Sequence, residues 1–170
     1  MCVYPVVFHI NITKIKSYIS LTHGEGYGLP LFEAAYNGLP IIAPAWSGQC
    51  DFLYLPVKYK KSKKTKLKAK FSSVKYRIGP VPKDVVWDGV IQDGSSWCYP
   101  EEGSYKMCLK TMHGNIKNAQ KDAKELQKWI LKNFTEEKKY QEFVDSIMSV
   151  VGVTREEIDW SRQINQMQVL

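Results

Sequence analysis

Short apolar runs alternate with glycine-rich segments in the first third of the chain, and this pattern predicts an α/β fold. "SYISLT" (17–22) and "LPIIAP" (39–44) have the composition of short buried strands. Between them, "HGEGYG" (23–28) predicts a loop, and a helix should begin near Leu29. A strand, loop, helix and strand in this order make a βαβ unit, which implies a parallel sheet and a right-handed crossover.

Both ends of this helix carry local signals. Pro30 suits the first helical turn, because a proline there loses no helical hydrogen bond. Asn37 and Gly38 should end the helix, with glycine as the C-terminal cap. The face expected to pack against the sheet consists of small and apolar residues, namely Leu31, Ala34, Ala35 and Gly38.

The rest of the chain changes from strands to helices. Residues 55–100 combine prolines with alternating apolar positions, which predicts short strands and a hairpin. From Gly103 onward, two sets of apolar residues recur at helical spacing: Ala119, Ala123, Leu126 and Ile130, then Tyr140, Phe143, Val144 and Ile147. They predict amphipathic helices that pack against the core, the second beginning at Thr135. "TREE" (154–157) is a capping box that should begin a last helix.

Composition is that of one ordinary globular domain, with 170 residues of which 44% are hydrophobic. No run approaches the roughly 18 apolar residues of a membrane span, and the first residues do not resemble a signal peptide. Four cysteines without a CxxC pair indicate neither a zinc site nor a disulfide framework. We therefore expect a reduced, cytoplasmic protein, with peripheral membrane attachment as a variant of that location.

The positive charge is concentrated in one segment. The formal net charge is +7, and the segment Lys58–Lys70 holds eight lysines, without which the charge would be −1. Because the charge is confined to one segment of a near-neutral protein, the composition argues against a nucleic-acid-binding fold. The segment could bind an anionic surface, at roughly 1 kcal/mol per charge near an anionic membrane. The alternative is a solvated loop or the exposed face of a hairpin.

The glycine loop is the main candidate for chemistry. A loop between a buried strand and a helix start directs backbone N–H groups at one spot, which favours phosphate. The loop should also lie at the carboxyl ends of the parallel strands, where ligands bind in such sheets. Glu25 and Glu33 flank the loop, and carboxylates accept hydrogen bonds from hydroxyl groups, so the pattern suits a nucleotide sugar. Alternatively, Glu33 only stabilises the helix and Glu25 is an exposed loop acid.

The stretch "HGEGYGLPLFEAAYNGLPIIAPAWSG" strongly resembles the donor-site segment of retaining GT-B glycosyltransferases, which carry an E-x7-E motif, here Glu25 to Glu33. The resemblance covers roughly residues 15–150 and is densest over 20–55. It implies an incomplete Rossmann-like parallel sheet with flanking helices, half of a GT-B fold, and a helical C-terminal region. The implied organisation is a non-matching segment 1–16, a donor-binding domain 17–150 with a strand and hairpin insertion at 55–100, and a helical arm 151–170.

The resemblance also implies roles for the site residues. Glu25 would be the catalytic residue that contacts the hydroxyls of the transferred sugar, and Glu33 would hold the ribose. Backbone amides of the loop would contact the diphosphate; these are Gly26, Tyr27, Gly28 and Leu29. The implied reaction transfers a hexose from a UDP-sugar or GDP-sugar with retention, without a cofactor and usually without a metal.

Part of the family pattern is missing from this chain. The acceptor domain and the first strands of the donor domain, which usually carry a basic pair for the diphosphate, are not recognisable. We therefore expect that a second chain or domain completes the cleft, that the sequence is a fragment, or that the domain binds without catalysing. A lysine of Lys58–Lys70 or Arg77 could replace the basic pair, and the spacing selects none of them.

Further candidates flank the loop or follow the second strand. His23 either contacts the donor or makes a local hydrogen bond. Ser47, Gly48 and Asp51 follow the second strand and should lie at the same ligand-binding edge of the sheet. Cys50 has no activating base nearby in the sequence and is not expected to be a nucleophile. Three tryptophans could stack on a sugar or base or belong to the core: Trp46, Trp87 and Trp97.

Overall fold

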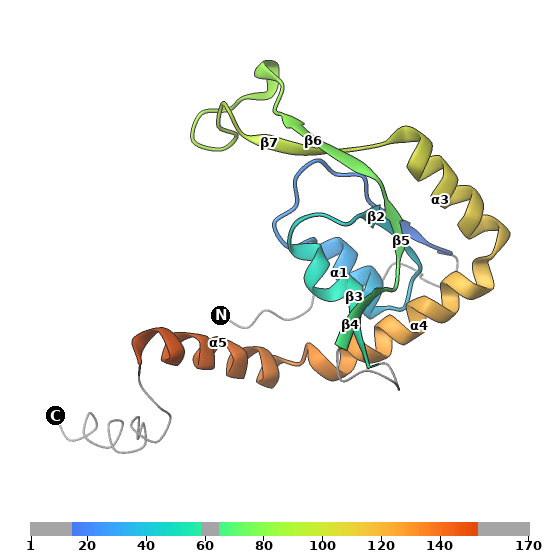
Figure 1. The fold of residues 1–170 in the computed structure, drawn as a ribbon, viewed down its shortest axis with the longest axis vertical. Coiled ribbons are helices and arrows are strands. Elements are labelled where there is room, and N and C mark those ends of the chain that lie inside the picture. Colours follow the sequence, from blue (N-terminus) through green and yellow to red (C-terminus); the bar gives the residue numbers. More distant parts are fainter. Residues whose placement is uncertain (1–14, 59–64, 153–170) are drawn as a thin grey trace. The chain divides into compact units, whose positions relative to one another are not determined.

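The structure is a computed structural model that describes residues 15–58 and 65–152, and the chain divides into two compact units, 1–130 and 131–170. The first unit is a mixed α/β structure (Figure 1). Its strands are β1 (Tyr18–Ile19), β2 (Ile41–Pro44), β3 (Tyr54–Lys58), β4 (Thr65–Ala69), β5 (Ser72–Val74), β6 (Tyr76–Pro80) and β7 (Ser96–Pro100). Its helices are α1 (Leu29–Tyr36), α2 (Cys50–Leu53), α3 (Glu102–Gly114) and most of α4 (Ile116–Asn133), with short 3₁₀ helices at Ser47–Gln49 (η2) and Lys83–Val85 (η3).

A three-stranded parallel sheet in the order β1-β2-β5 forms the centre of this unit. Tyr18 is paired with Ile41, and Ile42 is paired with Ser72. The predicted βαβ unit is therefore present as β1, α1 and β2 with parallel strands, and the general α/β class is confirmed. β1 is shorter than predicted because the chain leaves the sheet after Ser20, whose backbone N–H still donates to the Ile42 carbonyl (3.0 Å).

α1 ends as the sequence predicts. Gly38 has a φ of 72°, which a residue with a Cβ rarely adopts. Its N–H donates to Ala35, and the N–H of Leu39 donates to Ala34 (3.0 and 2.9 Å), which is the Schellman pattern. Because Leu39 uses its N–H to close the helix, β2 begins only at Ile41.

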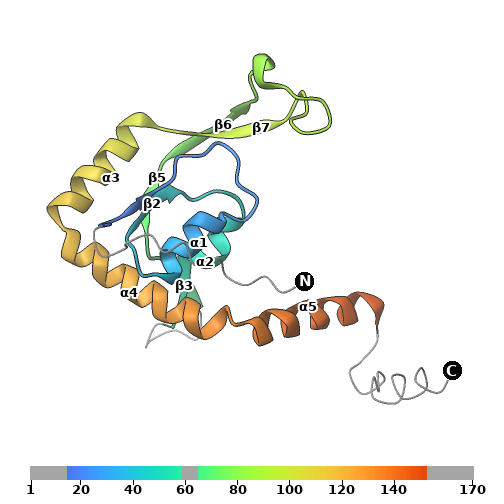
Figure 2. The same cartoon turned by 180° about the vertical axis from the view of Figure 1, so that it is seen from behind.

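The core forms on both faces of β2, all four residues of which are buried. Ile42 packs with Val74 and Met112, so that α3 covers one face of the sheet, as Figures 1 and 2 show. Successive side chains of a strand point to opposite faces, so Ile41 and Ala43 face the other way. The predicted inner face of α1 is confirmed for its three apolar members, Leu31, Ala34 and Ala35, which are buried. On α4, Ala123, Leu126 and Ile130 are buried as predicted.

Two antiparallel hairpins lie between β2 and α3, where the sequence predicts short strands and a hairpin. β3 pairs with β4, and β6 pairs with β7. The lysine-rich segment belongs to the first hairpin, in which Lys58, Lys66 and Lys68 are exposed. Its residues 59–64 lie outside the described part of the chain, and binding to an anionic surface stays a prediction.

Lys70 is an exception within the lysine-rich segment. Its side chain is only 4% exposed and forms ion pairs with Asp122 (2.6 Å) and Glu125 of α4. It is therefore part of the packing between the end of β4 and α4, and it is neither a solvated lysine nor available to an anionic surface. Burial alone would lower the pKa of Lys70, but hydrogen bonds and charges of the two acids outweigh it, so this pKa is raised.

Substituting Lys70→Met should lower the free energy of unfolding by about 1–2 kcal/mol at pH 7, because two charge-assisted hydrogen bonds are lost. The loss stays below that of a fully buried pair, since Asp122 and Glu125 are nearly half exposed. The hydrogen bond from Lys70 lowers the pKa of Glu125. The stabilisation from this ion pair is therefore fully present above the ordinary carboxyl pKa, and it is lost as the pH falls through the lowered pKa of Glu125.

Urea unfolding of wild type and Lys70→Met, repeated from pH 7 into the acidic range, measures both effects. The difference between the two proteins should shrink in acid. Lys68→Met is the matched control because Lys68 is an exposed lysine of β4, two residues before Lys70. An equal loss in both variants would contradict a special role of Lys70.

The second unit is described over residues 131–152 and contains α5 (Glu136–Val151). The helix begins after Thr135, whose hydroxyl accepts from the N–H of Lys138, as predicted. Its apolar side chains are exposed, however, including Tyr140, Phe143, Val144 and Ile147. The prediction that they pack into a core is wrong for this helix.

The predicted last helix and most of segment 1–16 lie outside the described residues, so the domain boundaries stay predictions. Among the helices of residues 15–58 and 65–152, none combines the length and apolar character needed to cross a membrane. The cytoplasmic location stays a prediction.

Candidate functional site

The glycine loop lies at the edge of the sheet where its parallel strands end. The loop follows β1, the turn from Ala45 to Gln49 follows β2, and Tyr76 comes shortly after β5. The Tyr76 hydroxyl donates to the Ala45 carbonyl (3.0 Å), and its ring meets Trp46 edge-on at 5.8 Å. Segments from all three strands therefore meet at one edge, the usual position of a ligand in such sheets.

The N-terminus of α1 forms one side of this edge. Gly28 is the N-cap, with φ 82° and ψ 51°, and no side chain caps the helix. The first turn contains no acidic residue, and Leu29 is 64% exposed. The N–H groups of a first turn have no partner within the helix, so this end is electropositive and suited to an anion.

The Ser47–Gly48 turn holds the glycine loop in place. The Ser47 hydroxyl donates to the Glu25 carbonyl at 2.5 Å, and the Gly26 carbonyl lies at 3.5 Å. A Cβ on Gly48 would lie 2.3 Å from the Gly26 carbonyl oxygen, so only glycine fits there. Ser47 and Gly48, predicted as secondary site residues, thus contact the backbone of the loop.

The two glutamates of the motif lie near the same phenol. Glu25 is half-buried, with the Thr22 hydroxyl 3.5 Å from its carboxylate, and Glu33 is exposed on α1. Burial, followed by the charges of Glu25 and then Glu33, raises the pKa of the Tyr18 hydroxyl. Both carboxylates are therefore within electrostatic reach of Tyr18 at the start of the loop.

Tyr27 anchors the loop to the core. Its ring contacts those of Phe32 and Phe52, with centroids 5.9 and 5.3 Å away. Burial and the nearby charge of Asp51 raise the pKa of Tyr27. Burial and Asp51 also raise the pKa of Cys50, so its thiol stays protonated at neutral pH, as expected of a cysteine that is not a nucleophile.

His23 joins the loop to the second hairpin. Its Nδ1 lies 2.8 Å from the Cys98 carbonyl, and its ring stacks on Trp97 with centroids 5.3 Å apart and planes within 4°. Tyr99 packs against the same ring at 4.9 Å, and the Arg77 guanidinium lies 4.6 Å from the centre of Tyr99. His23 therefore makes a structural hydrogen bond, as in one of its two predicted roles, although the partner is 75 positions away in the chain and not in the local segment.

Sequence reasoning did not identify Tyr99 or Gln49. The Gln49 side chain is buried next to Gly28, with its Oε1 3.4 Å from the position a Cβ would take there, and donates from Nε2 to the Pro44 carbonyl. Its Oε1 has no hydrogen-bond partner among the described residues. Neither residue belongs to a recognisable motif, so no local signal marked them.

The remaining aromatic candidate lies away from this edge: Trp87, in the connection between β6 and β7, is 66% exposed. Within residues 15–58 and 65–152, no three His, Cys, Asp or Glu side chains gather in a metal-binding cluster, and a metal-free site stays a prediction. Comparison of the chain with protein-family models, with curated proteins and with solved structures found no match.

Proposed function

We propose that this chain is the nucleotide-sugar-binding part of a retaining glycosyltransferase, half of a GT-B fold, which transfers a hexose from a UDP-sugar or GDP-sugar. The observation that carries the proposal is the position of the E-x7-E glutamates. Glu25 and Glu33 flank an uncapped helix N-terminus at the carboxyl edge of a parallel sheet. An anion site bordered by two carboxylates suits a ligand with phosphates between two sets of hydroxyls.

In this proposal each part of the donor has its own contacts. The backbone of Gly26, Tyr27, Gly28 and Leu29 holds the diphosphate. Glu33 accepts hydrogen bonds from the ribose, and Glu25 accepts them from the transferred sugar, because a carboxylate can hold two neighbouring hydroxyls. A second chain or domain supplies the acceptor side of the cleft.

Arg77 is the best-supported cation for the diphosphate. It follows β5 and is connected to the loop through Tyr99 and His23. The lysines of β4 precede β5 and so belong toward the opposite edge of the parallel sheet, and Lys70 is already paired with acids. A planar guanidinium also suits phosphate oxygens, to which it can donate two parallel hydrogen bonds.

A second function, a non-catalytic subunit of a larger assembly derived from such an enzyme, is favoured by one observation. α5 exposes apolar side chains that a monomer would usually bury, with Phe143 65% and Val150 87% exposed. The two functions differ in whether the donor is turned over, and both retain nucleotide binding at the loop.

Calorimetric titration of UDP-glucose, GDP-mannose, UDP and GDP into the full chain tests the proposal. We expect binding in the micromolar to millimolar range by at least one nucleotide sugar. Glu33→Ala should weaken the sugar nucleotide and the free nucleotide about 10-fold or more, which corresponds to about 1.4 kcal/mol. Glu25→Ala should weaken only the sugar nucleotide, because only the sugar contacts Glu25.

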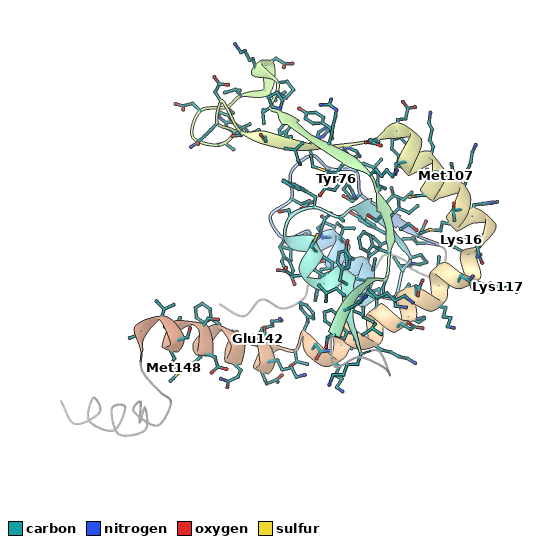
Figure 3. The ribbon with its side chains drawn as sticks, viewed as in Figure 1. Lys16, Tyr76, Met107, Lys117, Glu142 and Met148 are labelled. Carbon is teal, nitrogen blue, oxygen red and sulfur yellow. The ribbon has the colours of Figure 1, made fainter. Side chains whose placement is uncertain are left out.

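Glu142→Ala is the control, because it removes an exposed glutamate of α5, labelled in Figure 3, that pairs with Lys139. Its affinities should equal those of wild type. Absence of binding by all four ligands to protein that circular dichroism shows to be folded would overturn the proposal. Equal losses in the Glu33 and Glu142 variants would do so as well.

A further inference from the structure

A depression lined by lysines lies at the opposite edge of the sheet from the glycine loop. Its volume is about 410 Å³, and its wall is formed by Ile15, Lys16, Gly38, Leu39, Pro40, Lys117, Gln120, Lys121 and Lys124. Lys16 precedes β1, and Gly38 to Pro40 precede β2, so the depression opens where these parallel strands begin. Figure 3 labels Lys16 and Lys117, which lie on the same side of the first unit.

Three of the four lysines come from one face of α4. Lys117, Lys121 and Lys124 are spaced four and three residues apart, which places their side chains in one row on a helix. Lys124 is held over Gly38 by the Gln127 side chain, which accepts from Lys124 (3.2 Å) and donates to the Tyr36 carbonyl (2.8 Å). Gly38 leaves room for this contact, since a Cβ there would lie 3.1 Å from the Lys124 nitrogen.

The arrangement is electrostatically unfavourable without a ligand. Among residues 15–58 and 65–152, no acid lines the depression, and none of its four lysines forms an ion pair. Like charges four residues apart on a helix repel each other. The first turn of α4 contains Lys117 and no acid. Because the N-terminal end of a helix is electropositive, an acid would be favoured there and a lysine is not.

The acids of α4 are used elsewhere. Asp122 and Glu125 both form ion pairs with Lys70, and the charge of Lys121 makes the smallest contribution to the lowered pKa of Glu125, so the lysine row is at most partly neutralised from within α4. A bound anion would remove the repulsion and would also interact favourably with the helix end. The depression is open toward solvent, and its volume is sufficient for a compact anion.

We propose that this depression is a binding site for a compact ligand with two or more phosphate groups. The site is separate from the glycine loop, because the two lie at opposite ends of the parallel strands β1 and β2. The proposal therefore does not depend on the function of the loop.

Titration with inorganic tripolyphosphate at low and moderate salt tests the site. Wild type should bind it and show a higher melting temperature with it, with affinity falling as salt rises. Lys117→Ala/Lys121→Ala should bind at least 10-fold more weakly. Without ligand this variant should melt at the wild-type temperature or above it, because repulsion is relieved and alanine favours helix.

Lys110→Ala/Lys128→Ala removes the same charge from exposed helical positions outside the depression and should retain wild-type affinity. Gly26→Ala, whose added Cβ should hinder phosphates at the glycine loop without a clash inside the protein, should bind tripolyphosphate like wild type, which separates this site from the donor site. Vesicles with a bisphosphorylated inositol headgroup distinguish the source of the phosphates: pelleting that needs Lys117 and Lys121 assigns them to a lipid, and tripolyphosphate binding without pelleting assigns them to a soluble ligand. Equal affinity in the two double variants, or no binding by wild type, would overturn the proposal.

Discussion

Phe52→Ala should lower the free energy of unfolding by about 3–5 kcal/mol, because it removes a large buried ring and leaves a cavity. Phe52 has no exposed surface and lies 5.3 Å from the ring centroids of both Tyr27 and Phe32. It connects α2 to α1 and to the glycine loop. The rings around it cannot fill the space by small shifts, because their backbones belong to separate elements.

Phe143→Ala provides the matched control, with the same substitution at a ring that is 65% exposed on α5. Its effect on the free energy of unfolding should stay within about 0.5 kcal/mol, as for most surface substitutions. Urea or thermal unfolding of the two variants measures the difference. A large loss in Phe143→Ala would mean that this ring is packed in solution, and a small loss in Phe52→Ala would contradict the aromatic core.

Gly48→Ala should lower the free energy of unfolding by about 1–3 kcal/mol, the range for inserting a group where there is no room. The added Cβ would lie 2.3 Å from the Gly26 carbonyl oxygen and 3.1 Å from the Tyr27 Cα. These are backbone atoms, so no side-chain rotation relieves the contact and the loop must move. Nucleotide binding should weaken in the same variant if the loop holds the diphosphate.

Gly26→Ala separates these two effects. A Cβ on Gly26 would meet no atom within 4 Å, so this variant should unfold like wild type. If phosphates approach the loop backbone as proposed, the same Cβ should still weaken UDP binding, because glycine permits the close approach. Unfolding data together with calorimetry on both variants measure this, and wild-type stability of Gly48→Ala would show that the loop does not rest on the Ser47–Gly48 turn.

The parts of the fold that could be predicted depend on local signals. Pro30 and Gly38 marked the ends of α1, and Thr135 marked the start of α5, because each residue acts on its own turn. The two apolar runs predicted the parallel strands β1 and β2 around this helix. The candidate loop was recognisable for the same reason, since all its glycines and both glutamates lie within one short stretch.

The parts that could not be predicted depend on contacts between distant residues. Lys70 meets Asp122 across 52 positions, and His23 meets the Cys98 carbonyl across 75. Hydrophobic periodicity also cannot distinguish a buried helix face from an exposed one, as α5 demonstrates. Whether an apolar stripe becomes core depends on which element covers it, and that partner is not encoded in the stripe itself.

The position of the β3–β4 hairpin bears on the order in which the fold assembles. β5 completes the parallel sheet by pairing Ile42 with Ser72, and the whole hairpin lies in the intervening chain. Closing a long flexible segment costs entropy, and this cost delays non-local pairing. Pairing of Tyr54 with Ala69 brings the two ends of the hairpin together. The chain that remains to be closed is then the connection from β2 to Tyr54 and the short one from Ala69 to β5. We therefore expect early formation of the hairpin to lower the entropic cost of completing the sheet, although the hairpin contributes no strand to that sheet.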